Sequence, residues 1–135
     1  MVIDTSAFLA ILQDEPDRRS FTEAIGAAAV RRTSAATFVE ASMVLQSRYG
    51  AEGVQRLDML LETARIEVMT VDPAQARMAR RAFVDFGKGR HPAGLNYGDC
   101  FTYALARQLG EPLLCKSDDF AQTDLDLVLP PAPTP

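Results

Sequence analysis

Five acidic residues follow the apolar runs of this sequence, directly or within the first turns of the next expected helix. They are Asp4, Glu40, Asp99, Asp118 and Asp119. In parallel α/β folds, sites form beyond the carboxyl ends of the strands. If the apolar runs are parallel strands, these acids can therefore converge at one end of a sheet.

A cluster of this kind has a definite electrostatic problem. Two carboxylates about 5 Å apart repel each other by roughly 3 kcal/mol at an effective dielectric near 20. Four of them need a counter-charge or raised pKa values. Oxygen-only ligation, with no Cys/His pairing, favours Mg²⁺ or Mn²⁺ over zinc. Such an ion polarises a phosphodiester and lowers the pKa of bound water, which can then attack phosphorus in line.

Other hydrolytic and nucleotide-binding chemistries find little support. The chain has one histidine, which excludes a paired-histidine nuclease mechanism. It contains no P-loop, Gly-x-Ser-x-Gly or dinucleotide-binding glycine fingerprint.

Each acid also has a purely structural explanation. Asp99 can be a helix N-terminal acid three residues after an Asn96 cap. Glu40 fits a capping box with Thr37, although its helix is apolar nearly all round, so we expect Glu40 to be partly buried and paired. Asp4 can be a cap after a strand, and the pair 118–119 can be a plain turn.

Strands alternating with helices would position these acids. Apolar runs predict strands over 1–4, 30–33, 66–71, 112–116 and 125–129. Periodicity and caps predict helices over 7–13, 18–28, 51–64, 73–86 and 96–110, and one from Ser34 or Thr37 to Tyr49. The order implies an α/β fold with a mainly parallel sheet. We expect one domain over 1–129 and a disordered proline-rich tail over 130–135.

Composition and charge narrow the class of protein. The 135 residues are 47% hydrophobic and 24% charged, as in an ordinary globular domain. The net charge of −4 argues against non-specific nucleic-acid binding by positive charge. It does not exclude a nuclease, because acids that hold metal lower the net charge. Cys100 and Cys115 are expected to be free thiols, and we expect a cytoplasmic protein without signal peptide or membrane span.

Four segments together carry a family resemblance. They are Val2-Ile3-Asp4-Thr5-Ser6-Ala7, Thr37-Phe38-Val39-Glu40-Ala41, the stretch from Lys88-Gly89-Arg90-His91 to Asp99-Cys100-Phe101, and Leu113-Leu114-Cys115-Lys116-Ser117-Asp118-Asp119-Phe120. In this combination and order they resemble the motifs of PIN-domain ribonucleases, and in particular the VapC toxins of type II toxin–antitoxin (VapBC) systems. The resemblance spans residues 1 to about 128.

The resemblance implies a PIN-like three-layer fold and a Mg²⁺-dependent endoribonuclease that cuts structured RNA and inhibits translation. It implies Asp4 and Asp99 as main Mg²⁺ ligands, with Mn²⁺ as a substitute. Glu40 and Asp119 would bind a second ion, hold metal waters or activate the attacking water. A VapB-like antitoxin, a homodimer and toxin–antitoxin hetero-oligomers are the implied assemblies.

Several assignments stay open. Relatives of this branch usually carry Gly where Ser117 stands, and the position before Phe120 favours Asp119 as the fourth acid, with Asp118 as the alternative. Thr5 and Ser6 either fix Asp4 by hydrogen bonds or simply cap a helix. We expect Lys88 and Arg90, on a loop next to Asn96 and Asp99, to contact RNA phosphates. Lys116 either touches phosphate or pairs with Asp118.

Two other functions compete with this interpretation. A haloacid-dehalogenase or receiver-like protein would use Asp4 as a covalent nucleophile or phosphoacceptor, usually with another acid nearby. Thr5 and Ser6 follow Asp4 instead, which disfavours that acid-cluster phosphate-ester hydrolase. A non-catalytic PIN-like binding module, in which the acids only capture basic peptide segments, is the other alternative.

Overall fold

Residues 1–128 are described by a computed structural model. In this range five strands make one sheet: β1 (Val2–Ile3), β2 (Arg32–Ser34), β3 (Glu67–Met69), β4 (Leu113–Leu114) and β5 (Leu127–Val128). The helices are α1 (Thr5–Leu12), α2 (Arg18–Ala27), α3 (Ala35–Tyr49), α4 (Ala51–Thr63), α5 (Pro73–Phe86) and α6 (Tyr97–Leu109), with a short 3₁₀ turn η1 (Asp119–Gln122). The predicted tail over 130–135 and the end of the predicted domain at Leu129 lie outside the described residues.

The sheet is parallel throughout, in the order β3-β2-β1-β4-β5. After β1 the chain builds one half of the sheet through β2 and β3, and then crosses to β4 and β5 on the other side of β1. The connections therefore reverse direction beside β1. In open α/β sheets this reversal opens a crevice beyond the strand ends, and Asp4 stands at that point.

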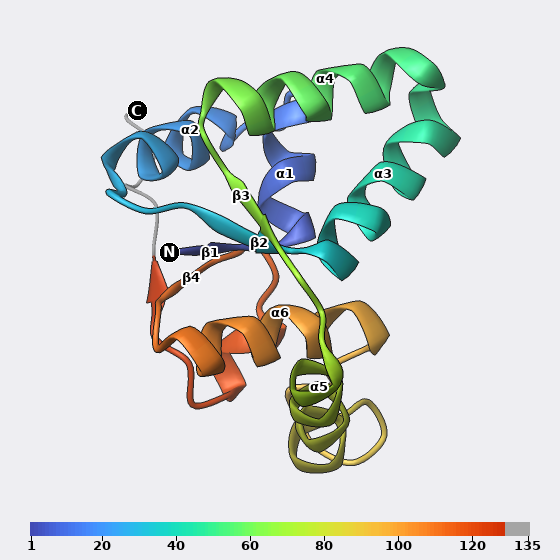
Figure 1. The fold of residues 1–135 in the computed structure, drawn as a ribbon, viewed down its shortest axis with the longest axis vertical. Helices are drawn as coiled ribbons and strands as arrows, with labels where there is room; N and C mark the ends of the chain where they lie inside the picture. The colour runs from blue at the N-terminus through green and yellow to red at the C-terminus, as the bar shows by residue number, and fades with distance from the viewer. Residues whose placement is uncertain (129–135) are drawn as a thin grey trace.

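Helices cover both faces of the sheet (Figure 1). The first four helices lie on one face, and α5 and α6 lie on the other. Val2 and Ile3 are fully buried and belong to different core clusters, because successive strand residues point to opposite faces. Ile3 packs with Phe8 and other residues of the first helices, whereas Val2 packs with residues of α5 and α6. The predicted three-layer α/β fold is confirmed.

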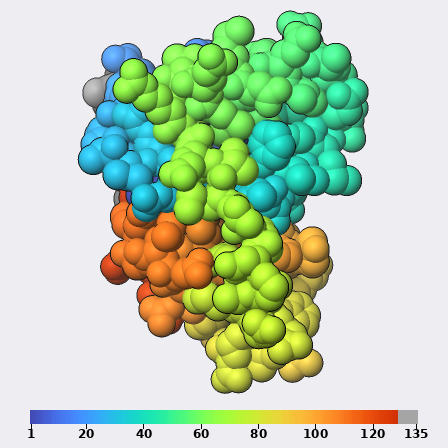
Figure 2. All heavy atoms as spheres, in the orientation of Figure 1, coloured from blue at the N-terminus to red at the C-terminus, as the bar shows by residue number. Residues whose placement is uncertain are grey.

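One edge of the sheet is open to solvent. In Figure 2 the side chains of β3 lie uncovered on the near face, between α4 above and α5 below. Glu67 and Val68 are exposed there. None of the predicted acids belongs to this edge, so the chemical site is built around the central strands instead.

Most element boundaries agree with the sequence prediction, and the differences have local causes. Helix α1 begins at Thr5 rather than Ala7, because the Asp4 carboxylate caps it by accepting from the Ser6 backbone N–H. The segment after β4, where residues 118–119 could have formed a plain turn, contains η1. Met43 on α3 and Met59 on α4 are 65% and 67% exposed, although both lie in apolar stretches of the sequence. Over residues 1–128, every helix is too short or too polar to cross a membrane.

Candidate active site

Asp4 is the buried centre of the site. It is only 3% exposed, yet three hydrogen bonds reach its carboxylate. The backbone N–H and the hydroxyl of Ser6 donate to Oδ2 at 3.0 and 2.7 Å. The hydroxyl of Thr102 donates to Oδ1 at 2.8 Å. Such bonds stabilise the ionised carboxylate where burial would otherwise disfavour it.

Ser6 connects Asp4 to the end of β4. The backbone N–H of Lys116 donates to the Ser6 hydroxyl at 2.8 Å, and that hydroxyl donates onward to Asp4. Of the two alternatives for Ser6, the structure supports the hydrogen bonds that fix Asp4. Ser6 does not cap the helix, because the N-cap of α1 is Asp4 itself. The Thr5 hydroxyl donates to Glu40 instead.

Glu40 approaches Asp4 from α3. Its Oε1 accepts a hydrogen bond of 2.6 Å from the Thr5 hydroxyl, and its side chain is partly buried, as predicted. The predicted capping box between Thr37 and Glu40 is wrong. Ser34 caps α3 instead, by accepting from the Ala36 backbone N–H. Glu40 is thus free of a capping role and points toward the site.

Asp99 stands at the start of α6. Asn96 caps α6, as predicted, and the two residues form a reciprocal capping box: the Asn96 backbone N–H donates to Asp99 Oδ2 at 3.1 Å, and the Asp99 N–H donates to the Asn96 side chain at 2.9 Å. Only one carboxylate oxygen is used in this way. Capping is therefore compatible with a second role for Asp99.

The pKa of Asp99 is raised by its burial and by neighbouring acids. This pKa is raised from 3.8 to about 7, and burial is the largest cause. The Asn96 N–H opposes the shift, and the charges of Asp4, Asp119 and Glu40 add to it. The four predicted acids therefore interact electrostatically across four separate elements of the chain.

Asp119 and Asp118 differ in their surroundings. Asp119 is half-buried in η1 and contributes to the raised Asp99 pKa, whereas Asp118 is exposed and is not among the charges that raise it. Burial, followed by the charges of Asp4, Asp99, Asp118 and Asp119, raises the pKa of the Cys115 thiol to about 12. The burial of Asp119 and its charge effect on the Asp99 pKa favour Asp119 over Asp118 as the fourth acid.

The charge of this cluster is not neutralised by the protein. Within residues 1–128, no lysine, arginine or histidine forms an ion pair with Asp4, Glu40, Asp99 or Asp119. Eight other acids in that range do have basic partners. They are Asp14, Glu15, Asp17, Glu23, Glu67, Asp85, Glu111 and Asp124. A bound cation would supply the missing charge.

The donor set fits a hard divalent cation in one particular mode. Across the described residues, no three His, Cys, Asp or Glu side chains are arranged to enclose a metal ion. Mg²⁺ does not need such a cage, because it usually keeps several waters and binds through one or two carboxylates plus substrate phosphate. Asp4 and Asp99, with acids beside them, suit that mode.

The basic residues fall into two groups. Lys88 and Arg90 are exposed on the predicted loop, and the Arg90 guanidinium lies over the Phe83 ring, 5.7 Å from its centroid. The predicted alternative that Lys116 pairs with Asp118 is wrong. The Lys116 ammonium instead forms ion pairs with Glu15 and Asp17, at 3.2 Å from the latter. Asp17 precedes α2, but its side chain makes no capping hydrogen bond to that helix.

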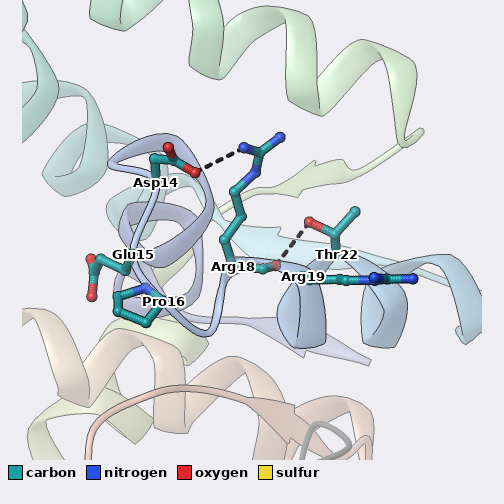
Figure 3. A pocket seen from close by; sticks show the side chains of 6 residues that line it. All are labelled: Asp14, Glu15, Pro16, Arg18, Arg19 and Thr22. Carbon is teal, nitrogen blue, oxygen red and sulfur yellow. Dashed lines mark hydrogen bonds and ion pairs between the residues drawn. The ribbon is translucent and has the colours of Figure 1, made fainter. Parts of the chain in front are cut away.

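A surface hollow of about 500 Å³ lies next to these ion pairs, at the turn between α1 and α2 (Figure 3). Its lining residues are Asp14, Glu15, Pro16, Arg18, Arg19 and Thr22. Asp14 and Arg18 form an ion pair of 2.9 Å across it. None of the four clustered acids lines this hollow, and its charges are already paired, so we do not assign the chemistry to it.

Sequence reasoning missed three residues of the site. Thr37 and Thr102 are buried, and their hydroxyls lie 3.1 Å apart behind Asp4. Gly98 lies so near Glu40 that an added Cβ would be 2.6 Å from the Glu40 carboxyl carbon. Their position next to Glu40 or Asp99 in the chain was the only sequence signal, and it did not indicate which side chains would meet.

The family follows from sequence comparison. The sequence model of the PIN domain matches residues 1–125. This chain belongs to the PIN domain family. Within the family it is similar to ribonuclease VapC30 of Mycobacterium tuberculosis, with 47% identity over 131 residues that cover 97% of this chain and 100% of the relative. Ribonuclease VapC of Mycolicibacterium smegmatis is 49% identical over 128 residues, which cover 95% and 99% of the two chains. The predicted PIN and VapC resemblance is confirmed.

Solved structures support the PIN fold. Mycobacterium tuberculosis VapC20, described as a sarcin-ricin loop cleaving toxin, superposes with a TM-score of 0.79 over 96% of this chain and 98% of its own, at 19% identity. VapBC2 from Rickettsia felis, bound to a promoter DNA fragment, gives 0.76 over 94% and 96% of the chains, at 14% identity. At these identities the likeness concerns the fold alone.

Proposed function

We propose that this PIN-domain chain is a Mg²⁺-dependent endoribonuclease and the toxin of a type II toxin–antitoxin pair. The observation that carries the proposal is the set of four carboxylates, Asp4, Glu40, Asp99 and Asp119, near the point where the strand connections reverse direction beside β1. None of the four has a basic partner among the described residues. The names of its VapC relatives supply the reaction class. RNA is therefore the proposed substrate.

The chain's own groups suggest how the reaction is organised. Asp4 and Asp99 would hold the cation, and Asn96 and Ser6 keep their carboxylates in place. Mg²⁺, when bound, would polarise the scissile phosphodiester and lower the pKa of an attacking water. Glu40 and Asp119 are the candidates to accept the proton of that water or to orient metal-bound waters. Lys88 and Arg90 are exposed and would contact RNA phosphates.

The proposed partners follow from the structural relatives. VapBC complexes from Rickettsia felis and nontypeable Haemophilus influenzae share this fold, which supports a VapB-like antitoxin as partner. Toxin–antitoxin hetero-oligomers, a homodimer and a cytoplasmic location are proposed with it. Inhibition of translation would follow from cleavage of a structured RNA.

The test is cleavage of total cellular RNA by purified, antitoxin-free protein in Mg²⁺, Mn²⁺ or EDTA. We expect discrete fragments with either ion and none in EDTA. Asp4→Asn and Asp99→Asn should each lower the rate by about two orders of magnitude or more. Asp85→Asn is the matched control, because this exposed acid pairs with Arg81 and lies outside the cluster.

The competing functions predict other results. Cleavage that survives Asp4→Asn would overturn the proposed mechanism. Hydrolysis of a small phosphate ester through a covalent Asp4 intermediate, without RNA cleavage, would favour a phosphatase. Binding of a basic peptide by a folded protein that cleaves neither substrate would favour the non-catalytic module.

A further inference from the structure

The two carboxylate oxygens of Asp4 accept different numbers of hydrogen bonds. An ionised carboxylate offers about four lone-pair positions, two on each oxygen. Ser6 uses both positions on Oδ2, through its backbone N–H and its hydroxyl. Thr102 uses one position on Oδ1. In the described part of the chain, the oxygen with room for a further ligand is therefore Oδ1, the one that Thr102 holds.

The proton of Thr102 has a fixed direction. A hydroxyl has a single proton, and that of Thr102 is donated to Asp4. The contact between Thr37 and Thr102 must therefore have Thr37 as the donor. The result is a directed chain from the Thr37 hydroxyl through the Thr102 hydroxyl to Asp4 Oδ1. It joins α3, α6 and the end of β1.

Burial holds the hydrogen-bonded series Thr37–Thr102–Asp4 in place. Thr37 and Thr102 are each 1% exposed, so water does not compete for their hydroxyls. A threonine inside a helix commonly bonds to a backbone carbonyl one turn earlier. Thr102 instead reaches a carboxylate 98 positions away in the chain. This arrangement orients Asp4 from behind.

We propose that Thr102 is a positioning residue that presents Oδ1 of Asp4 to the divalent cation, and that Thr37 fixes the Thr102 hydroxyl. This inference rests on the proposed metal-dependent function. It adds that Asp4 binds the cation through one oxygen. Partners that orient a ligand in this way typically contribute 10- to 100-fold to metal affinity.

The simpler explanation is that Thr102 only satisfies a buried polar group of the core. The two explanations differ in what the hydroxyl controls. A core role predicts lost stability with unchanged metal affinity in the folded protein. A positioning role predicts lost affinity in protein that is still folded.

The experiment measures Mn²⁺ affinity of the full, RNA-free chain by electron paramagnetic resonance of unbound Mn²⁺. The test variant is Thr102→Val, which removes the hydroxyl at nearly constant shape, and Thr102→Ser restores it. Thr33→Val is the matched control. Thr33 is also fully buried, and its hydroxyl donates to the carbonyl of Ile3, next to Asp4 but not to its carboxylate.

We expect Thr102→Val to weaken Mn²⁺ binding about tenfold or more. Thr102→Ser should restore most of the affinity, Thr37→Val should lower it by less than Thr102→Val, and Thr33→Val should leave it unchanged. Thermal unfolding identifies folded protein, and if Thr102→Val does not fold, the affinities of Thr102→Ala and Thr37→Val decide the matter.

Two failures can be told apart. If the parent protein and folded Thr102 variants bind Mn²⁺ equally well, the positioning role is wrong and the proposed ribonuclease stands. If the parent protein binds no Mn²⁺ and its RNA cleavage is insensitive to EDTA, the metal-dependent function is wrong and the positioning role fails with it.

Discussion

The Glu40 carboxylate occupies the space that a side chain at Gly98 would need. A Cβ added there would lie 2.6 Å from the Glu40 carboxyl carbon, closer than carbon atoms approach without displacement. The backbone of Gly98 needs no unusual conformation, since it lies in the first turn of α6. Any larger residue at this position would therefore have to displace the Glu40 carboxylate, which is the far end of a flexible side chain from another helix.

This contact predicts the effect of Gly98→Ala. The added methyl group would push Glu40 away from Thr5, so we expect RNA cleavage to fall about tenfold or more while the protein still folds. Gly26→Ala is the control, because nothing lies within 4 Å of a Cβ at that helical position. It should keep full activity and gain roughly 0.4–1 kcal/mol in free energy of unfolding. Cleavage rates and thermal melts of both variants check the prediction, and unchanged cleavage by Gly98→Ala would show that Glu40 is not needed where it lies.

The raised pKa of Asp99 predicts a pH-dependent metal affinity. Its pKa of about 7 means that the metal-free carboxyl is protonated at lower pH, and a cation must displace that proton. Affinity for Mn²⁺ should therefore rise up to about tenfold per pH unit between about pH 5 and 7, and level off above. Titrations across this range measure the slope, which Asp99→Asn should flatten. A parent slope near zero would contradict the assignment of Asp99 as a ligand.

The same pKa fixes the sign of a stability effect. Because the pKa of Asp99 is raised in the folded protein, its contribution to the free energy of unfolding is fully present below pH 3.8 and is lost as pH rises through about 7. Mg²⁺ should then raise the melting temperature more at about pH 8 than at about pH 5. Melting curves with Mg²⁺ or EDTA test this, and a larger effect at the lower pH would count against it.

Mutation should distinguish the roles of the two neighbouring aspartates, Asp118 and Asp119. Asp119 contributes to the raised pKa of Asp99 and is half-buried, whereas Asp118 is exposed. We expect Asp119→Asn to lower both the cleavage rate, by about tenfold or more, and the pKa of Asp99. Asp118→Asn should change either quantity little. NMR titration of the side-chain carboxyl carbons and cleavage assays give both readouts, and the reverse order of effects would assign Asp118 as the fourth acid.

We expect Lys88 and Arg90 to act in RNA binding, and Lys116 to act in stability. Lys88→Ala and Arg90→Ala should each raise KM several-fold and reduce its dependence on salt, by roughly 0.7 in the logarithmic slope. Lys116→Ala should leave that slope unchanged, because its ammonium is paired with Glu15 and Asp17. Its cost should be about 0–1 kcal/mol in free energy of unfolding. Measuring KM at several salt concentrations separates the two groups, and a reduced slope for Lys116→Ala would place it on RNA.

Local sequence patterns predicted much of the secondary structure and the family of this protein. The apolar runs that end at Asp4 and Lys116 predicted strands, which the structure contains as β1 and β4, and the sequence before Asp99 predicted the Asn96 cap that α6 has. These features depend on residues a few positions apart, whose interactions the sequence displays directly. The order of the motifs predicted the PIN family.

Other features required partners from distant parts of the chain. Thr37 looked like a helix cap, but Ser34 caps α3 and leaves its hydroxyl for Thr102. Lys116 lies near Asp118 in sequence, yet the fold brings Glu15 and Asp17 to its ammonium.

Sequence by itself thus determined which residues carry charge, where helices and strands begin to within about two residues, and which acids stand at strand ends. Tertiary structure alone decided which residues each acid meets or acts on: Thr102 at Asp4, Thr5 and the backbone of Gly98 at Glu40, and Asp119 through its charge on Asp99. The reason is physical. Backbone preferences act over a few residues, whereas hydrogen bonds and charge interactions at a site depend on distances that only the packing of layers fixes.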